Sequence, residues 1–282
     1  MPLQYNEYYN EQTGLTIGLK KLLFSKQSEY QLVEVYETDT WGNLMTIDGM
    51  VMLSERDEFV YHEMLSHVAM FTHPEPKRVL IIGGGDGGTA REVLKHPSVE
   101  SVEMVEIDKT VVDASKLHMP EVGDFDNPKL NVLYEDGIAF IKNVKKPYDV
   151  IIIDGSDPVG PAEGLFEKDF YQFCYDALAD DGVLTTQTES PWVESYHPSM
   201  KKVFSALEDL FPVSKMYLSF IPLYPAGMWS MGFASKNQNP LSDRVTSRIE
   251  SHSGLLKTLK YYNKDVHTGS FALPNFVADI IR

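Results

Sequence analysis

The stretch Val79–Gly88, which reads VLIIGGGDGG, decides the fold. Its apolar half indicates a strand, and the glycines after it fit the G-x-G-x-x-G pattern of a turn that leads from a strand into a helix. Glycines in such a turn let the backbone change direction sharply and approach a ligand closely. The stretch therefore predicts the first strand of an α/β sheet, with a ligand bound where that strand ends.

The sequence on both sides alternates between strand-like and helix-like segments. Strands are expected at 78–82, 101–106, 130–134, 149–153 and 182–187, and helices at 89–95, 109–116, 137–143 and 167–178. This alternation predicts a parallel, doubly wound sheet. An amphipathic helix around 200–207 and strands near 213–221 and 229–234 follow, so we expect the sheet to end in an antiparallel pair.

The first 55 residues have a different pattern. Short strand-like segments lie near 15–19, 30–36, 44–47 and 50–53, and Asp48-Gly49 is a typical hairpin turn. Ser54–Asp57 then resembles a capping box, and apolar residues recur at helical spacing from Tyr61 to Val68. We therefore predict a small N-terminal β domain, residues 1–55, and an α/β domain, residues 56–282.

Composition narrows the class of protein. The 282 residues include 41 acids and 25 bases, a net charge of −16, which would repel nucleic acid. The acidic surface serves either solubility or the attraction of a cationic substrate, and charge alone does not choose between them. No apolar run has the roughly 20 residues of a membrane span. The N-terminus lacks the pattern of a signal peptide, and Cys174 is the single cysteine, so we expect a cytoplasmic protein that binds neither nucleic acid nor membrane.

Two acids indicate the kind of ligand. Glu106 ends the strand after the glycine loop, where a carboxylate can hold the ribose hydroxyls of an adenosine. Enzymes that use NAD and enzymes that use S-adenosylmethionine share this device. Asp86 lies within the loop itself, where it would repel a pyrophosphate but attract a sulfonium or an ammonium. The alternative for Asp86 is a hydrogen bond within its own turn.

Further acids fall at the predicted carboxyl ends of strands, where ligands of open α/β sheets bind. Asp136 follows the third strand, and its alternative role is to cap the next helix. Asp154 and Asp157 follow the fourth strand, and Asp157 could instead be a turn residue before Pro158. A purely structural carboxylate at Asp154 would be costly at the end of so apolar a strand, so Asp154 is the strongest candidate for chemistry.

Together these segments resemble the spermidine synthases over nearly the whole chain. The specific pieces are SEYQ at 28–31, LSERDEFVYHEM at 53–64, the glycine loop, DGSDPVGPA at 154–162 and IPLYPAG at 221–227. The resemblance implies a Rossmann-like doubly wound sheet of the class I methyltransferase type with a small N-terminal β domain. It implies transfer of an aminopropyl group from decarboxylated S-adenosylmethionine to putrescine, which gives spermidine and 5′-methylthioadenosine. A homodimer or homotetramer is expected.

The resemblance also implies roles for individual residues. Donor binding would fall to Gln31, Asp86, Glu106, Asp136 and Gly137, with Pro161 against the nucleoside. Glu106 would take the ribose hydroxyls, Asp136 the adenine amino group and Asp86 the aminopropyl ammonium. The diamine channel would be lined by Tyr61, His62, Asp157 and Tyr224, and Asp154 would be the general base. The donor is a co-substrate whose sulfonium is already an activated leaving group, so no further cofactor and no metal is expected. Gly155 and Ala226 stand where many members have a hydroxyl residue, which leaves the fine substrate preference open.

Two other functions remain as alternatives. A methyltransferase would use intact S-adenosylmethionine, whose extra carboxylate is disfavoured beside Asp86. A non-catalytic nucleoside- or polyamine-binding protein would have no need of a base at Asp154. Among acceptors, cadaverine, agmatine and spermidine remain possible beside putrescine, because one methylene changes binding by only about 1–3 kcal/mol. Cys174, Met50, Met52 and Trp229 are interpreted as packing residues.

Overall fold

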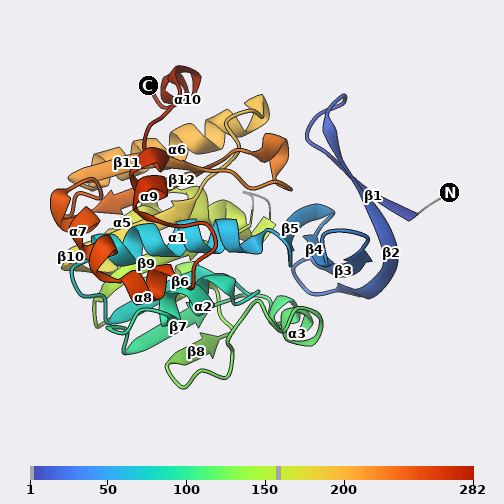
Figure 1. Ribbon diagram of the computed structural model, residues 1–282, viewed down its shortest axis with the longest axis horizontal. Coiled ribbons are helices and arrows are strands. Elements are labelled where there is room, and N and C mark those ends of the chain that lie inside the picture. Colours follow the sequence, from blue (N-terminus) through green and yellow to red (C-terminus); the bar gives the residue numbers. More distant parts are fainter. Residues whose placement is uncertain (1–2, 157–159) are drawn as a thin grey trace.

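The computed structural model describes residues 3–156 and 160–282, without the side chain of Pro161, and contains two sheets that lie side by side (Figure 1). The N-terminal sheet is an antiparallel meander in which each strand pairs with the next. Its strands are β1 (Leu3–Tyr8), β2 (Gly14–Gln27), β3 (Leu32–Thr38), β4 (Asn43–Ile47) and β5 (Met50–Ser54). The expected β-rich N-terminal region is therefore present.

The second sheet has seven strands in the order β11-β12-β10-β9-β6-β7-β8. Five of them are parallel: β6 (Arg78–Gly83), β7 (Ser101–Val105), β8 (Leu130–Leu133), β9 (Tyr148–Asp154) and β10 (Leu178–Gln187). The expected antiparallel pair is β11 (Val213–Ser219) with β12 (Trp229–Ser235). The strand order reverses between β6 and β9, so a crevice forms where these two strands end.

Helices cover both faces of this sheet, which explains the long apolar runs of its central strands β6 and β9. Along β6, Val79 and Ile81 belong to one core cluster, whereas Leu80 and Ile82 belong to the other. One face carries α1 (Glu58–Thr72), α2 (Gly88–Leu94) and α7 (Asp243–Ser251), and the other carries α5 (Lys168–Ala177) and α6 (His197–Leu210). The remaining helices are α3 (Lys109–His118), α4 (Gly137–Ile141), α8 (Ser253–Leu256), α9 (Lys264–Ser270) and α10 (Asn275–Ile280), with short 3-10 turns at Gly160–Phe166, Glu194–Tyr196 and Pro225–Gly227. Cys174 is fully buried on α5, as expected.

The structure differs from the sequence prediction at three places. Strand β1 was not expected, and neither were the short helices after residue 242. The capping-box interpretation of Ser54 was wrong, because α1 begins at Glu58 with Asp57 in the cap position. The Ser54 hydroxyl instead donates to Asp57 Oδ1 at 2.6 Å, and Asp57 Oδ2 accepts from the Leu223 amide at 3.2 Å. Asp57 thus connects the start of α1 to a loop that is distant in the sequence, and no local sequence pattern predicts this contact.

An apolar cluster joins the two sheets. Val33, Met45 and Leu53 of the N-terminal sheet pack with Ala114 of α3 and Met119. A polar contact reinforces this junction, because the Ser28 hydroxyl donates to Asp108 Oδ2 at 2.7 Å, and Asp108 caps α3. The turn that contains Gln31 is therefore fixed against the carboxyl end of β7.

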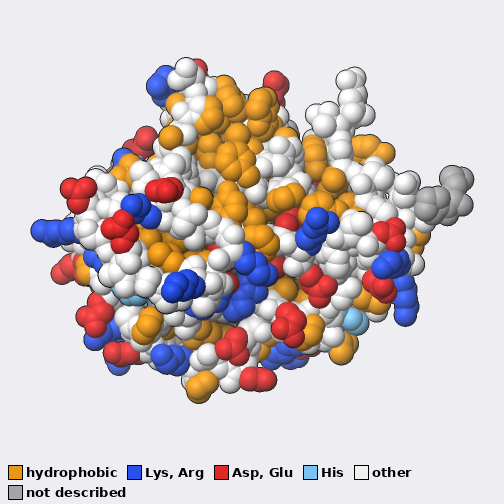
Figure 2. All heavy atoms as spheres, viewed as in Figure 1, with side chains coloured by type: hydrophobic (Ala, Val, Ile, Leu, Met, Phe, Trp, Pro, Cys, Tyr) orange, Lys and Arg blue, Asp and Glu red, His pale blue; other side chains and the backbone are white. Residues whose placement is uncertain are grey.

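Acidic and basic side chains are interspersed over the face shown in Figure 2. Within the described residues, no helix combines the length and the apolar character that crossing a membrane requires.

The Glu63 carboxylate anchors the C-terminal region to α1. It is 1% exposed and accepts the backbone amides of Lys260, Tyr261 and Tyr262 at 2.7–2.8 Å. Glu63→Ala would leave three amides without this acceptor, so we expect the free energy of unfolding to fall by at least about 2 kcal/mol. Urea denaturation measures the loss. Glu208→Ala on the exposed face of α6 should change stability by less than about 0.5 kcal/mol, and an equal effect of both substitutions would contradict this role of Glu63.

Candidate active site

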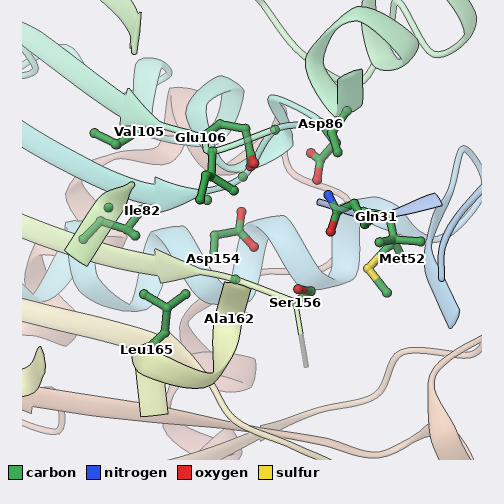
Figure 3. A pocket seen from close by; sticks show the side chains of 18 of the residues that line it. Gln31, Met52, Ile82, Asp86, Val105, Glu106, Asp154, Ser156, Ala162 and Leu165 are labelled. Carbon is green, nitrogen blue, oxygen red and sulfur yellow. The ribbon is translucent and has the colours of Figure 1, made fainter. Parts of the chain in front are cut away.

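A pocket opens at the carboxyl ends of β6, β7 and β9 and is closed on one side by the N-terminal sheet (Figure 3). The structure brings together in its lining every predicted site residue for which it gives a side-chain position, and Gly137 as well. These residues are Gln31, Tyr61, His62, Asp86, Glu106, Asp136, Gly137, Asp154 and Tyr224. Asp157 and the side chain of Pro161 lie outside the described part of the chain, so their assignments stay predictions.

The glycine loop brings the backbone of β6 against the end of β9. The Gly84 amide donates to the Asp154 carbonyl at 2.9 Å, and both Gly83 and Gly84 have left-handed backbone angles, with φ of 84° and 72°. A Cβ atom at Gly83 would lie 2.1 Å from the Asp154 carbonyl oxygen, and one at Gly84 would lie 2.9 Å from Asp154 Oδ2. Only glycine fits at these positions, as the motif predicts.

Asp154 is the carboxylate at the centre of the pocket and is 9% exposed (Figure 3). Its Oδ1 accepts the Tyr61 hydroxyl at 2.7 Å. Its Oδ2 is buried and makes no hydrogen bond of ordinary geometry to the described residues, although the Thr89 hydroxyl is close enough to lower the pKa somewhat. Burial, and next the Asp86 carboxylate, raise the pKa of Asp154 above the ordinary aspartate value. A carboxylate that lines a pocket and has a raised pKa is suited to accept a proton.

Asp86 makes the hydrogen bond within its own turn that the sequence left open, and it also lines the pocket. Its Oδ1 accepts the Gly88 amide at 2.7 Å within the turn, and the same atom lies 3.1 Å from His62 Nε2. Burial opposes ionisation, but His62 outweighs it and lowers the pKa of Asp86. A ring nitrogen of His62 and one carboxylate oxygen each of Asp86 and Asp154 all lie within 4.8 Å of one another.

Glu106 and Asp136 are two further acids in the lining of the pocket. Glu106 is 8% exposed, and its Oε1 accepts the Asp108 amide at 2.8 Å. Burial raises the pKa of Glu106 to about 7. Asp136 caps α4 by accepting the Ile138 amide at 2.8 Å, so the alternative considered for it is confirmed, while its side chain also lines the pocket. Gly137 is needed because a Cβ there would lie 2.4 Å from Ile82 Cγ2.

A second, smaller pocket adjoins the first. Met52, Tyr61, Gly155, Ser156 and Tyr224 line both. The second pocket is also lined by Glu7 of β1 and by Gln187 and Trp229. Gln187 Nε2 donates to the carbonyls of Gly155 and Ser156 at 3.0 and 3.2 Å, and the Trp229 indole donates to Gln187 Oε1 at 3.2 Å. These residues therefore hold the backbone that follows Asp154.

Several of these residues were not predicted from the sequence. Met52 and Trp229 were interpreted as packing residues alone, yet both line a pocket. Glu7 was missed because β1 was missed, and only the register of β1 brings Glu7 to Val51, whose amide it accepts at 2.7 Å. Nothing in the sequence around Glu7 predicts that this glutamate of a short edge strand lines a pocket.

Comparison with known proteins decides the family. Residues 58–244 match the family described as the spermine/spermidine synthase domain, and residues 4–55 match the spermidine synthase tetramerisation domain. The chain belongs to the spermidine synthase family. It is accordingly an aminopropyltransferase of polyamine biosynthesis, as the resemblance in the sequence implied.

Individual relatives agree over their full lengths. The polyamine aminopropyltransferases of Alkaliphilus oremlandii and Clostridioides difficile are 44% and 45% identical, and each alignment covers 100% of this chain and 99% of the relative. Among solved structures, a spermidine synthase in complex with the transition state analogue AdoDATO has a TM-score of 0.93 at 42% identity, covering 100% of this chain and 96% of that one. The spermidine synthase of Thermotoga maritima has a TM-score of 0.91 at 42% identity, covering 100% and 95% of the two chains. The expected Rossmann-like fold with a small N-terminal β region is confirmed.

The raised pKa of Glu106 gives a pH prediction for nucleoside binding. A ribose hydroxyl donates to a carboxylate, so binding favours the ionised form, which is lost as the pH falls through about 7. We expect the affinity for methylthioadenosine to weaken up to about tenfold between pH 8 and pH 6, as measured by calorimetry. Glu106→Gln should bind weakly with little pH dependence. A flat profile in the unmodified protein would contradict this role for Glu106.

Proposed function

We propose that Asp154 is the general base in the transfer of the aminopropyl group of decarboxylated S-adenosylmethionine to putrescine. The observation that supports this most directly is the position of its carboxylate. Asp154 lines the larger pocket, and its Oδ1 accepts the hydroxyl of Tyr61, which is one of the residues that the two pockets share. A base at that junction is within reach of a nucleophile from one pocket and an electrophile from the other.

The larger pocket suits the donor. The apolar side chains of Ile107, Ile138 and Leu165 line it together with Asp136, which we propose to accept the adenine amino group. Glu106 would accept the ribose hydroxyls. The aminopropyl ammonium would be bound by Asp86, whose ionised form His62 favours, and by Gln31, which lies on the N-terminal side of the pocket (Figure 3). The analogue-bound relative, which is similar over the whole chain, supports a nucleoside ligand here.

The smaller pocket suits a diamine. Tyr61 and Tyr224 supply aromatic faces for the methylene chain, with ring centroids 5.8 Å apart. Glu7 is the carboxylate among the described lining residues of this pocket, and we propose that it attracts the distal ammonium of putrescine. Asp157, which follows Asp154 in the chain, is proposed to orient the reacting amine.

The chemistry requires these charges. An amine with an ordinary pKa near 10 is protonated at pH 7, and removing its proton costs about 4 kcal/mol. Asp154 would take that proton as the nitrogen attacks the carbon beside the sulfonium. The new C–N bond forms as the C–S bond breaks, and neutral methylthioadenosine leaves. Because both reactants are cations, much of the rate would come from holding them in line against their repulsion.

Asp154→Asn tests the proposed base. The substitution preserves the shape of the side chain but removes the proton acceptor, so we expect kcat to fall by about 10²–10⁴. Methylthioadenosine binding should change by less than about threefold, as measured by calorimetry on the same sample. Loss of nucleoside binding with no separate loss of kcat would contradict the role of Asp154.

Asp149→Asn is the matched control for this substitution. Asp149 lies on the same strand, at the opposite end from the pocket, where its Oδ2 accepts the Lys77 and Arg78 amides at 2.8 Å. Asparagine retains an acceptor oxygen there, so turnover should stay within about twofold of the unmodified enzyme.

We further propose that the chain acts as a homo-oligomer in the cytoplasm, as a dimer or tetramer. The match of residues 4–55 to a tetramerisation domain supports this proposal, and Leu3, Tyr8 and Leu22 of that sheet are 52%, 73% and 44% exposed. The division into residues 1–55 and 56–282 also remains a proposal, supported by the separate strand pairing of the two sheets. The donor is proposed as a co-substrate, with no step assigned to a further cofactor.

A further inference from the structure

A chain of alternating charges runs from α2 into the active site. Arg91 makes two contacts with the Glu58 carboxylate, Nη1 to Oε1 at 3.0 Å and Nη2 to Oε2 at 2.8 Å. Glu58 Oε2 lies 2.6 Å from His62 Nδ1, and His62 Nε2 lies 3.1 Å from Asp86 Oδ1. Glu58 is 7% exposed and His62 is 1% exposed, so these contacts are little screened by water.

The local structure fixes each member of the chain. Glu58 and His62 are one turn apart on α1, and Glu58 lies in the first turn of that helix. The His62 ring packs against Gly88 at the start of α2, where a Cβ atom would lie 2.3 Å from the ring. Arg91 also donates to the Val122 carbonyl at 2.7 Å and to Glu92 Oε1 at 2.8 Å. His62 therefore has little freedom to turn away from Asp86.

The proposed reaction requires two neighbouring carboxylates, Asp86 and Asp154, to be ionised at the same time. Asp86 must be ionised to bind an ammonium, and Asp154 must be ionised to act as a base, yet their oxygens lie within 4.8 Å in a buried site. Two carboxylates in such a place share a proton unless a cation stands beside them. Although burial acts in the opposite direction, Asp86 and then Glu58 raise the pKa of His62 to about 10.

We propose that Glu58 is a positioning residue for aminopropyl transfer, which with Arg91 holds His62 as an imidazolium beside Asp86 so that Asp86 and Asp154 are ionised together. This inference rests on the roles proposed above for those two aspartates. Glu58 itself touches neither reactant pocket among the described lining residues.

The charged groups around His62 come from α1, the glycine loop, α2 and β9. Glu58 lies on its own helix, Asp86 and Arg91 belong to the glycine loop and α2, and Asp154 ends β9. The Tyr61 ring meets the imidazole edge-on, with centroids 5.4 Å apart. Removing the charge of Glu58 leaves Asp86 as the one carboxylate hydrogen-bonded to His62 in the described residues. The His62 imidazolium then loses its proton more readily. As a result, Asp86 and Asp154 retain a shared proton to higher pH.

Glu58→Gln tests the inference because it removes the charge and preserves the shape. We expect the kcat/KM for decarboxylated S-adenosylmethionine at pH 7 to fall at least tenfold. The acid limb of its pH profile should move to higher pH by about one unit, so that activity partly recovers toward pH 9. Binding of methylthioadenosine, which has no aminopropyl group, should change by less than about threefold.

Glu92→Gln is the matched control. Glu92 is also a buried partner of Arg91, but its Oε2 faces His67 Nε2 at 3.0 Å and not His62. It should leave the pH profile and the KM for the donor within about twofold of the unmodified enzyme. An equal shift of both profiles would overturn the inference, because the effect would then come from Arg91 or from general loosening.

A second measurement needs no variant at Glu58. In NMR titration of the unmodified protein, with His62→Gln used to assign the signal, the His62 imidazole should remain protonated above pH 8. Titration near the ordinary value of about 6.5 would overturn the inference even if Glu58→Gln failed to fold. This outcome is separate from failure of the proposed base, which would appear as retained turnover in Asp154→Asn.

Discussion

Repulsion among three carboxylates that line one pocket is the constraint on which the rest of the site depends. Asp86, Glu106 and Asp154 end adjacent parallel strands or the loops after them, so the fold itself brings them together. Water screens such charges poorly in a pocket, and each group therefore needs a specific partner or a bound cation. The Tyr61 hydroxyl on Asp154, the Asp108 amide on Glu106 and the Gly88 amide on Asp86 are those partners in the protein.

The same constraint explains why the substrates are cations. An ammonium and a sulfonium bound beside these carboxylates would stabilise their ionised forms. Glycines pack closely around Asp154 and fix the position of its carboxylate among the other acids. Gly83 and Gly84 bring the backbone so close to β9 that a side chain would displace the carboxylate. The position of the Asp154 carboxylate therefore depends on the glycine loop, which is the clearest motif in the sequence.

Much of this was predictable from local pattern. The glycine loop, the alternation of strands with helices, and acids placed just after apolar strands are features of neighbouring residues, and they located Asp86, Glu106, Asp136 and Asp154 in one pocket. Family resemblance added Gln31, Tyr61, His62 and Tyr224, which local pattern alone did not single out. All of them line the pocket.

The parts that escaped prediction depend on contacts between distant segments. Glu7 reaches the second pocket only through the register of β1 against β2 and its bond to Val51. Asp57 accepts the Leu223 amide, and Glu63 accepts backbone amides at 260–262. These partners are too distant in the sequence for a local pattern to predict the contacts. Glu58 lay in a recognised motif, yet its link to His62 and Arg91 requires the packing of α1 on α2.

The electrostatic account is tested most directly by comparing two donors that differ in one charge. Calorimetric titration of the unmodified protein with decarboxylated and with intact S-adenosylmethionine isolates the effect of a single added carboxylate beside Asp86. The account predicts that the decarboxylated form binds at least about tenfold more tightly. Equal affinity, or tighter binding of the intact form, would contradict the claim that the site is built to balance its acids against a cationic donor.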